Sequence, residues 1–476
     1  MASPFLVSVR TPQRPRRRRL GAAVLAALVA CAMVLTGCSA PESEAPPTSA
    51  PPTPVSLPDT MVGNQAQWVI DTMNAAPAPE VSEAEVKATE ERFAQLMLDE
   101  VSAADLSALF NGLRDQRTWV PTAVKEFDDS MIVTLHGTSG EPVDMSIAVD
   151  SVGKIQYLFF GPVAADRKAA TSWDELESAL QDSTADISMA VTEVDGGGNT
   201  NVFSHNGDDV MPLGSIFKLY VLGAVATAVA NGTLTWETPV TITDDIRSLP
   251  SGVLQDAANG TQVTVQQAAE KMISISDNTA TDALFALVGR DAVEQQLTSM
   301  GNKNASLDLP FLNTRELFTL GWGSDPAVRT QWRDADEAGR RAMLAALPTG
   351  DLGMDGSEIT DSVWQYGLDW FATSGDLVAA HTALQALADT DAGAPIRDIL
   401  SLNPGTGMTI GEEWTYVGFK GGSAPGVLAG SWYVEGENGK HYVLSIQGSS
   451  TSPDELNDAL TFFGNVEDAL AILAKS

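Results

Sequence analysis

GSIFKLYV, residues 214–221, places a serine and a lysine three residues apart at the head of an apolar segment. The segment continues to Val225 and then meets Asn231-Gly232, which is typical of a helix C-terminus. The pattern predicts a buried helix with Ser215 in its first turn. There the hydroxyl lies beside free backbone N–H groups at the positive end of the helix dipole, with Lys218 on the same face.

This stretch has two interpretations. If Lys218 is buried, its pKa falls and the neutral amine can take the proton of a nucleophilic Ser215. Alternatively, Ser215 is an ordinary helix cap beside an ordinary lysine. A second Ser-x-x-Lys, residues 151–154, lies in a segment that reads as a hairpin turn, so the motif alone does not choose between them.

A second polar motif, Ser276-Asp277-Asn278, starts 61 residues after Ser215. It follows a helical stretch, 265–272, and stands at the start of another, 279–287. In a functional interpretation, Ser276 relays a proton to a leaving group and Asn278 holds a substrate amide carbonyl. In a structural interpretation, these residues cap the second helix, a position that serine, aspartate and asparagine all favour.

A third motif, Lys420-Gly421-Gly422, lies on a predicted strand and is followed by Ser423. Lys420 can bind a substrate carboxylate, and the small Gly422 lets a substrate lie against the strand edge. The backbone N–H groups of Ser423 and Ser215 would together form an oxyanion hole. The alternative is a glycine bulge beside a solvated lysine.

In this order, the three motifs resemble those of the serine β-lactamase and penicillin-binding-protein superfamily, with an arrangement like class A β-lactamases. The resemblance implies an α/β (α+β) domain over residues 169–476, with an antiparallel sheet flanked by helices. Alternating segments agree with this fold, because they fall at both ends of the region: 187–194, 201–204, 415–421, 427–434 and 442–447. It also implies that Ser215 is the nucleophile, Lys218 its base and Ser276 the proton relay.

The chain departs from this family's pattern at three places. Gly421 lacks a hydroxyl that normally helps to bind the substrate carboxylate, although Ser423 could compensate. Leu309, in Leu309-Pro310-Phe311-Leu312-Asn313, occupies the position of the family's glutamate, and leucine cannot activate water. Asp308 and Glu316 are close in sequence but out of register. About forty additional residues form a predicted lobe with helices over 332–347 and 362–372 and three loop acids, Asp351, Asp355 and Glu358.

The first residues read as a leader rather than as part of the fold. Arginines precede an apolar run, Leu20 to Leu35, and Leu35-Thr36-Gly37-Cys38 resembles a bacterial lipobox. We therefore expect a signal peptide over 1–37, a lipid on Cys38, a disordered Pro/Ser/Ala-rich linker over 38–58 and an extracytoplasmic, membrane-anchored protein. An uncleaved transmembrane helix is the alternative, but the run is short for one.

Residues 59–168 predict a small α+β domain. Helical patterns cover 65–73, 83–100 and 103–113, and strand patterns cover 130–136, 143–149 and 155–160. The other predicted domain, 169–476, ends in an amphipathic helix expected over 454–474. Helices followed by a curved sheet resemble the nuclear-transport-factor-2 (NTF2) and ketosteroid-isomerase shape. We expect this domain to be structural or to present the substrate.

Charge restricts the partners. The chain has a formal net charge of −34, and removal of the six arginines of residues 1–37 leaves 22 basic against 62 acidic side chains, or −40. Such a surface repels nucleic acid. The four histidines are scattered, so no metal or other cofactor is predicted. The function predicted is a serine hydrolase acting on a small-molecule or cell-wall substrate, and the alternative is a single-turnover penicillin-binding sensor or cell-wall scaffold.

Overall fold

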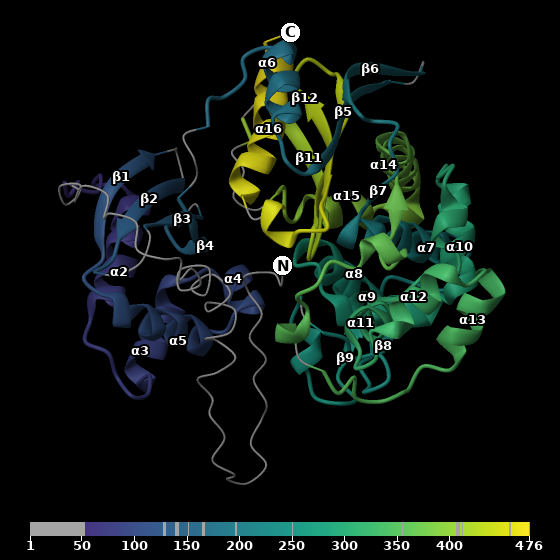
Figure 1. Ribbon diagram of the computed structural model, residues 1–476, viewed down its shortest axis with the longest axis horizontal. Coiled ribbons are helices and arrows are strands. Elements are labelled where there is room, and N and C mark those ends of the chain that lie inside the picture. Colours follow the sequence, from purple (N-terminus) through teal and green to yellow (C-terminus); the bar gives the residue numbers. More distant parts are fainter. Residues whose placement is uncertain are drawn as a thin grey trace, which may run out of the picture. The chain divides into compact units, whose positions relative to one another are not determined.

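The computed structural model describes most of the chain from Thr53 to Lys475. The described ranges are 53–126, 130–138, 142–150, 152–163, 167–195, 198–249, 251–354, 356–405, 410–411, 413–456 and 458–475. The predicted signal peptide, Cys38 and the linker up to residue 52 lie outside these ranges. The chain divides into two compact units between residues 166 and 167 (Figure 1). Within the described ranges, no helix is both long and apolar enough to cross a membrane.

The N-terminal unit contains a four-stranded antiparallel sheet and a set of helices. The helices are α2 (Met61–Asn74), α3 (Glu83–Arg92), α4 (Gln95–Glu100), α5 (Ala103–Leu113) and the 3₁₀ turn η1 (Arg114–Gln116). The strands, in sheet order, are β1 (Val120–Glu126), β2 (Ser130–His136), β3 (Val143–Val149) and β4 (Ile155–Pro162). Buried and half-buried residues alternate along β2, as expected for a sheet with one face on a core. This unit has its own apolar core, drawn from both its helices and its strands.

The single helix predicted over 83–100 is wrong, because the chain is extended at Phe93 and Ala94, between α3 and α4. Phe93 forms a parallel bridge with Ile155, and the Ala94 N–H donates to the Ile155 carbonyl at 2.8 Å. The Phe93 ring is buried beside Trp68. Tertiary contacts of this kind override a local helical pattern. Strand β1 is a further element that the pattern did not indicate.

The C-terminal unit is built around a five-stranded antiparallel sheet of order β11-β12-β13-β5-β6. Its strands are β5 (Asp186–Asp195), β6 (Gly198–His205), β11 (Trp414–Ala424), β12 (Val427–Gly436) and β13 (His441–Ser449). β5 pairs with β13, so strands from both ends of this unit form one sheet, which confirms the prediction. Two pairs of short strands lie outside it: β7 (Met211–Pro212) with β10 (Phe371–Ala372), and β8 (Pro239–Thr241) with β9 (Gln262–Thr264).

Helices cover both faces of this sheet. Over one face, α6 (Trp173–Gln181) and α16 (Ala459–Leu473) pack together, as Figure 1 shows. Over the other lie α14 (Ser374–Ala388) and α15 (Pro395–Ser401). The remaining helices are α7 (Lys218–Ala230), α8 (Val265–Ser274), α9 (Asn278–Val288), α10 (Arg290–Ser299), α11 (Thr314–Trp322), α12 (Ala327–Asp334) and α13 (Glu337–Ala345). Short 3₁₀ turns complete the unit: η2 (Gly214–Phe217), η3 (Leu254–Asp256), η4 (Ala305–Asp308), η5 (Gly356–Glu358), η6 (Trp364–Tyr366), η7 (Asp391–Gly393) and η8 (Pro453–Leu456).

The helix predicted from GSIFKLYV is present as η2 followed by α7. Every residue of α7 from Lys218 to Ala226 is buried, as expected for a helix that other helices surround. Apolar side chains from α8, α9, α10 and α14 belong to the same core cluster. This central position keeps the first turn of α7 fixed, which a catalytic side chain requires.

The added lobe differs from its prediction in two places. Residues 332–347 do not form one helix, because α12 ends at Asp334 and Asp336 caps α13 by accepting the Gly339 N–H. Residues 362–372 are not helical beyond η6, since Gly367 is left-handed, with φ +71°, and β10 pairs with β7. We call residues 332–372, the bounds of the predicted lobe, the added segment below.

The C-terminal helix also starts later than predicted. Helix α16 begins at Ala459 rather than at Asp454, because Asp458 caps it by accepting the Thr461 N–H.

Candidate active site

The predicted nucleophile, Ser215, lies in η2, which leads directly into α7. Side chains three residues apart eclipse one another in a 3₁₀ turn, so Ser215 and Lys218 share one face. Ser215 is half-buried, and Lys218 is completely buried. The preceding Gly214 has φ +50°, a conformation that favours glycine. This tight turn sets the position of the serine at the head of α7.

Lys218 is surrounded by oxygen atoms of the second motif. Its Nζ donates to Asn278 Oδ1 at 2.7 Å, to the Ser276 carbonyl at 2.6 Å and to Ser276 Oγ at 3.0 Å. Burial lowers the pKa of Lys218 well below its usual value of 10.5, and the positive charge of Lys420 lowers it further. Asp277 and Asp282 oppose this effect. A lysine with a lowered pKa can act as a general base.

Lys420, from β11, reaches the same hydroxyl from the other side. Its Nζ donates to Ser276 Oγ at 3.1 Å and to the Gly421 carbonyl at 2.7 Å. The side chain is buried, and burial lowers the pKa of Lys420 to about 7. Two lysines therefore donate to one serine oxygen, which leaves the hydroxyl proton of Ser276 to be donated elsewhere. This is the geometry that a proton relay needs.

The loop around Ser276 is held in an unusual conformation. Ser276 has φ +57°, which is uncommon for a residue other than glycine and is often found at functional sites. Its carbonyl also accepts from Ser251 Oγ at 2.7 Å. The neighbouring Asp277 is fully buried. The Asp277 carboxylate accepts three backbone N–H groups, those of Val253, Leu254 and Ala280.

Asn278 is placed beside Lys218 rather than in the open. It is 6% exposed, and its Nδ2 donates to the Leu249 carbonyl at 3.2 Å while its Oδ1 accepts from Lys218. These contacts show that Asn278 orients the lysine. A direct contact with the substrate stays a prediction for this residue.

Strand β11 passes very close to the turn that carries the nucleophile. A Cβ placed on Gly422 would lie 2.0 Å from the Leu213 carbonyl oxygen and 2.7 Å from the Ser215 nitrogen. A Cβ placed on Gly214 would lie 2.7 Å from the Ser423 nitrogen. Only glycine at both positions permits this approach. The contact brings together the two backbone segments that carry the predicted oxyanion donors.

The C-terminal unit that contains this site matches a known protein family. The family model of the Beta-lactamase enzyme family matches residues 171–470, more than half of the chain. The chain belongs to this family. Its C-terminal unit has the β-lactamase-like fold, an antiparallel sheet flanked by helices, and homology to this family supports a serine hydrolase. A second model, the N-terminal part of the ORF 12 gene product, matches residues 57–155. The predicted NTF2-like shape of that unit stays a prediction.

Individual relatives are distant. Beta-lactamase VEB-1 from Pseudomonas aeruginosa is 26% identical over 170 residues, which is 35% of this chain and 54% of VEB-1. The chain therefore spans about half the length of that relative. A β-lactamase structure from Sphaerobacter thermophilus is 22% identical and covers 63% of this chain and 95% of that one, with a TM-score of 0.45. A mutant of PBP-A, solved as an acyl-enzyme complex with penicillin G, is 17% identical and covers 64% and 96%, also with a TM-score of 0.45.

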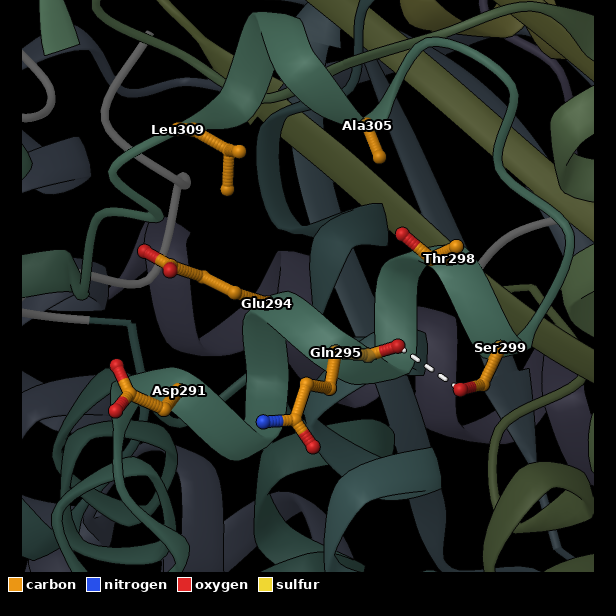
Figure 2. Close-up of a pocket in the computed structure, with 7 residues that line it drawn as sticks. All are labelled: Asp291, Glu294, Gln295, Thr298, Ser299, Ala305 and Leu309. Atoms are coloured by element: carbon orange, nitrogen blue, oxygen red, sulfur yellow. Dashed lines mark hydrogen bonds between the residues drawn. The ribbon is translucent and has the colours of Figure 1, made fainter.

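Leu309, which the sequence motif predicts to stand in place of the family's glutamate, lines a hollow of about 540 Å³ next to α10. Figure 2 shows its side chain above the hollow, pointing toward the helix that carries Glu294. The other lining residues are Asp291, Glu294, Gln295, Thr298, Ser299 and Ala305. Glu294 is engaged there, because it accepts the Phe311 N–H and binds Arg341. That Leu309 occupies the position of the family's glutamate stays a prediction from the sequence motif.

The nearby acids identified in the sequence have other partners. Glu316 pairs with Arg290 and caps α11, and Asp308 is buried and accepts the Phe371 N–H at 2.9 Å. In the loop of the added segment, Asp351 and Glu358 are exposed, and Asp355 lies outside the described ranges. Throughout the described ranges, no group of three or more His, Cys, Asp and Glu residues is arranged to hold a metal ion.

One residue at the site was not identified from the sequence. The Asp369 carboxylate accepts the backbone N–H groups of Gly214 at 2.8 Å, Leu213 at 3.1 Å and Trp370 at 2.7 Å. Burial raises the pKa of Asp369 to about 7, although these hydrogen bonds act to lower it. Asp369 has no recognisable motif around it in the sequence. Only folding brings it to the turn before Ser215, so no signal in the sequence indicated its role.

Proposed function

We propose that this chain forms an acyl-enzyme on Ser215 with a β-lactam, a related ester or a peptidoglycan-derived amide. Lys218 takes the hydroxyl proton as Ser215 attacks the carbonyl carbon. As the bond between that carbon and the leaving group breaks, Ser276 donates its hydroxyl proton to the leaving group and takes the proton held by Lys218 in return. The N–H groups of Ser215 and Ser423 stabilise the oxyanion. Asn278 and Lys420 receive the rest of the substrate, and Gly422 lets β11 approach the Ser215 turn.

The observation that supports this most directly is the convergence on Ser276. Two buried lysines from distant parts of the chain, Lys218 and Lys420, both donate to its hydroxyl oxygen. Burying two cationic groups side by side costs free energy, and such a cost is characteristic of a site kept for chemistry. The pKa of both lysines is lowered, which favours the neutral amine that proton transfer requires.

Release of the acyl group is a separate question, because Leu309 cannot activate water. We propose that deacylation is slow. This favours a second candidate function, a single-turnover penicillin-binding sensor or cell-wall scaffold, over a fast β-lactamase.

Turnover separates the two candidates. With a chromogenic cephalosporin in excess, a hydrolase releases many product molecules per protein, and the Ser215→Ala variant releases none. A sensor shows a burst of about one product per protein and then stops. A wild type that shows neither a burst nor turnover would contradict the acyl-enzyme proposal itself.

We also propose that Cys38 carries a lipid and holds the chain on the outer face of the cell membrane. The support is the Leu35-Thr36-Gly37-Cys38 sequence behind a basic and apolar leader. Metabolic labelling with a fatty acid in a bacterial host tests this. Label in the wild type and none in Cys38→Ser are expected, whereas equal label in both would refute it.

A further inference from the structure

The end of the added segment lies directly against the turn that carries the nucleophile. β10 pairs with β7, so that Phe371 lies opposite Pro212, and the Leu213 N–H donates to the Trp370 carbonyl at 2.8 Å. The Trp370 ring stacks on Phe217, with ring centroids 3.5 Å apart. These contacts fix the two residues that follow Asp369 to the turn that contains Ser215.

Asp369 completes this attachment through its side chain. It is 4% exposed, and one carboxylate oxygen accepts both the Gly214 and the Leu213 N–H groups. Gly214 is the residue whose φ of +50° and close approach to Ser423 set the direction of the next peptide unit. That peptide unit carries the Ser215 N–H, one of the proposed oxyanion donors.

We infer that Asp369 is a positioning residue for acylation. Its side-chain oxygen anchors the peptide unit before the oxyanion donor, and so keeps the Ser215 N–H directed at the place where negative charge develops. The inference rests on the proposed acyl-enzyme function, and it gives the added segment a role in the reaction. Asp369 acts only through the backbone of the Ser215 turn.

Positioning of the Ser215 turn depends on where the acceptor oxygen of Asp369 lies, and not on the negative charge of the carboxylate. Two other buried carboxyl groups lie in the surroundings: burial raises the pKa of Asp308, and negative charge on Asp369 or Asp376 raises it further. A charge effect of Asp369 would therefore act on Asp308, whereas the hydrogen bonds from the Gly214 and Leu213 N–H groups need only an acceptor oxygen. An amide oxygen at position 369 can accept the same N–H groups, whereas a longer side chain moves the acceptor away. Asp369→Asn and Asp369→Glu therefore separate geometry from charge.

The experiment measures acylation of the full chain by a fluorescent penicillin in a rapid-mixing time course. Asp369→Ala and Asp369→Glu are expected to slow the acylation rate constant by about ten- to a hundredfold, since a small misplacement of a catalytic group has effects of this size. Asp369→Asn is expected to stay within about threefold of the wild type. Noncovalent affinity for the penicillin should change little in all three.

Asp336→Ala is the matched control, because Asp336 also lies in the added segment and accepts a backbone N–H, but at the start of α13. It should leave the acylation rate unchanged. If Asp369→Ala does not fold, the acylation rate constants of Asp369→Glu and Asp369→Asn still test the positioning role. If the wild type and the Asp369→Glu variant are labelled equally fast, the positioning role of Asp369 is refuted and the proposed acyl-enzyme function is not. A wild type that neither penicillin nor a fluorophosphonate labels would overturn the proposed function, and this inference with it.

Discussion

At the scale of single residues, the site depends on lysines kept in an unfavourable environment. Lys420 is buried, and its pKa of about 7 means that it changes charge within the physiological range. Below that pH it is an ammonium group that can bind a carboxylate, and above it the neutral amine binds a carboxylate weakly. Substrate recognition therefore needs Lys420 in its charged form, whereas proton transfer needs Lys218 in its neutral form.

We therefore expect acylation by a carboxylate-bearing penicillin to depend on pH. The rate at low substrate concentration should fall as the pH rises through about 7, because Lys420 loses its proton there. In Lys420→Arg the side chain stays charged, so this alkaline decline should disappear. Initial rates between pH 5.5 and 9 provide the measurement. An identical decline in both proteins would show that another group titrates.

At the scale of elements, the site is an intersection of η2, α7 and β11. Gly422 and Gly214 allow the strand to touch the turn, because a Cβ on Gly422 would lie 2.0 Å from the Leu213 carbonyl oxygen. Gly421, between Lys420 and Gly422, has a different environment. A Cβ there would meet the Phe419 ring at 2.9 Å, and a side-chain ring can move.

Gly422→Ala should therefore disrupt the site while Gly421→Ala does not. We expect the first change to destabilise the fold by about 1–3 kcal/mol through overpacking. It should also slow acylation by about a hundredfold or more, because it separates the two oxyanion donors. Gly421→Ala is the matched control and should be close to wild type in both respects. Chemical denaturation and penicillin labelling give the two values, and equal behaviour of the variants would contradict this explanation.

The sequence predicted these elements well where a periodic pattern coincided with burial. α7 and strands β5, β12 and β13 were predicted from their apolar residues, and each lies within a core. The break at Phe93 and the backbone conformation at Trp370 were not predicted, since they depend on partners distant in sequence, Ile155 and Leu213. The three predicted motifs could be recognised because each is contiguous in the sequence. Asp369 could not, because it reaches the Gly214 N–H only in the folded chain.

At the scale of the whole molecule, the chain consists of two units with separate apolar cores. One cluster draws only on residues 62–158, and three others draw only on residues from Ala170 onward. All the residues of the proposed site lie in the second unit. Cores that share no residues favour independent folding.

We therefore expect residues 167–476, produced alone, to fold and to be acylated by penicillin within about threefold of the full-length rate. Circular dichroism and thermal unfolding check the fold, and fluorescent-penicillin labelling checks the site. The same fragment carrying Ser215→Ala is the control. A folded fragment that reacts more than tenfold slower would show that the N-terminal unit contributes to the site.

The central claim is that Ser215 forms a covalent acyl-enzyme that decays slowly. A time course of intact mass after mixing with benzylpenicillin tests it most directly. We expect the wild type to gain the mass of one penicillin and to keep it long after free penicillin is removed, and Ser215→Ala to gain nothing. An unmodified wild type, or an adduct that also forms on Ser215→Ala, would contradict it.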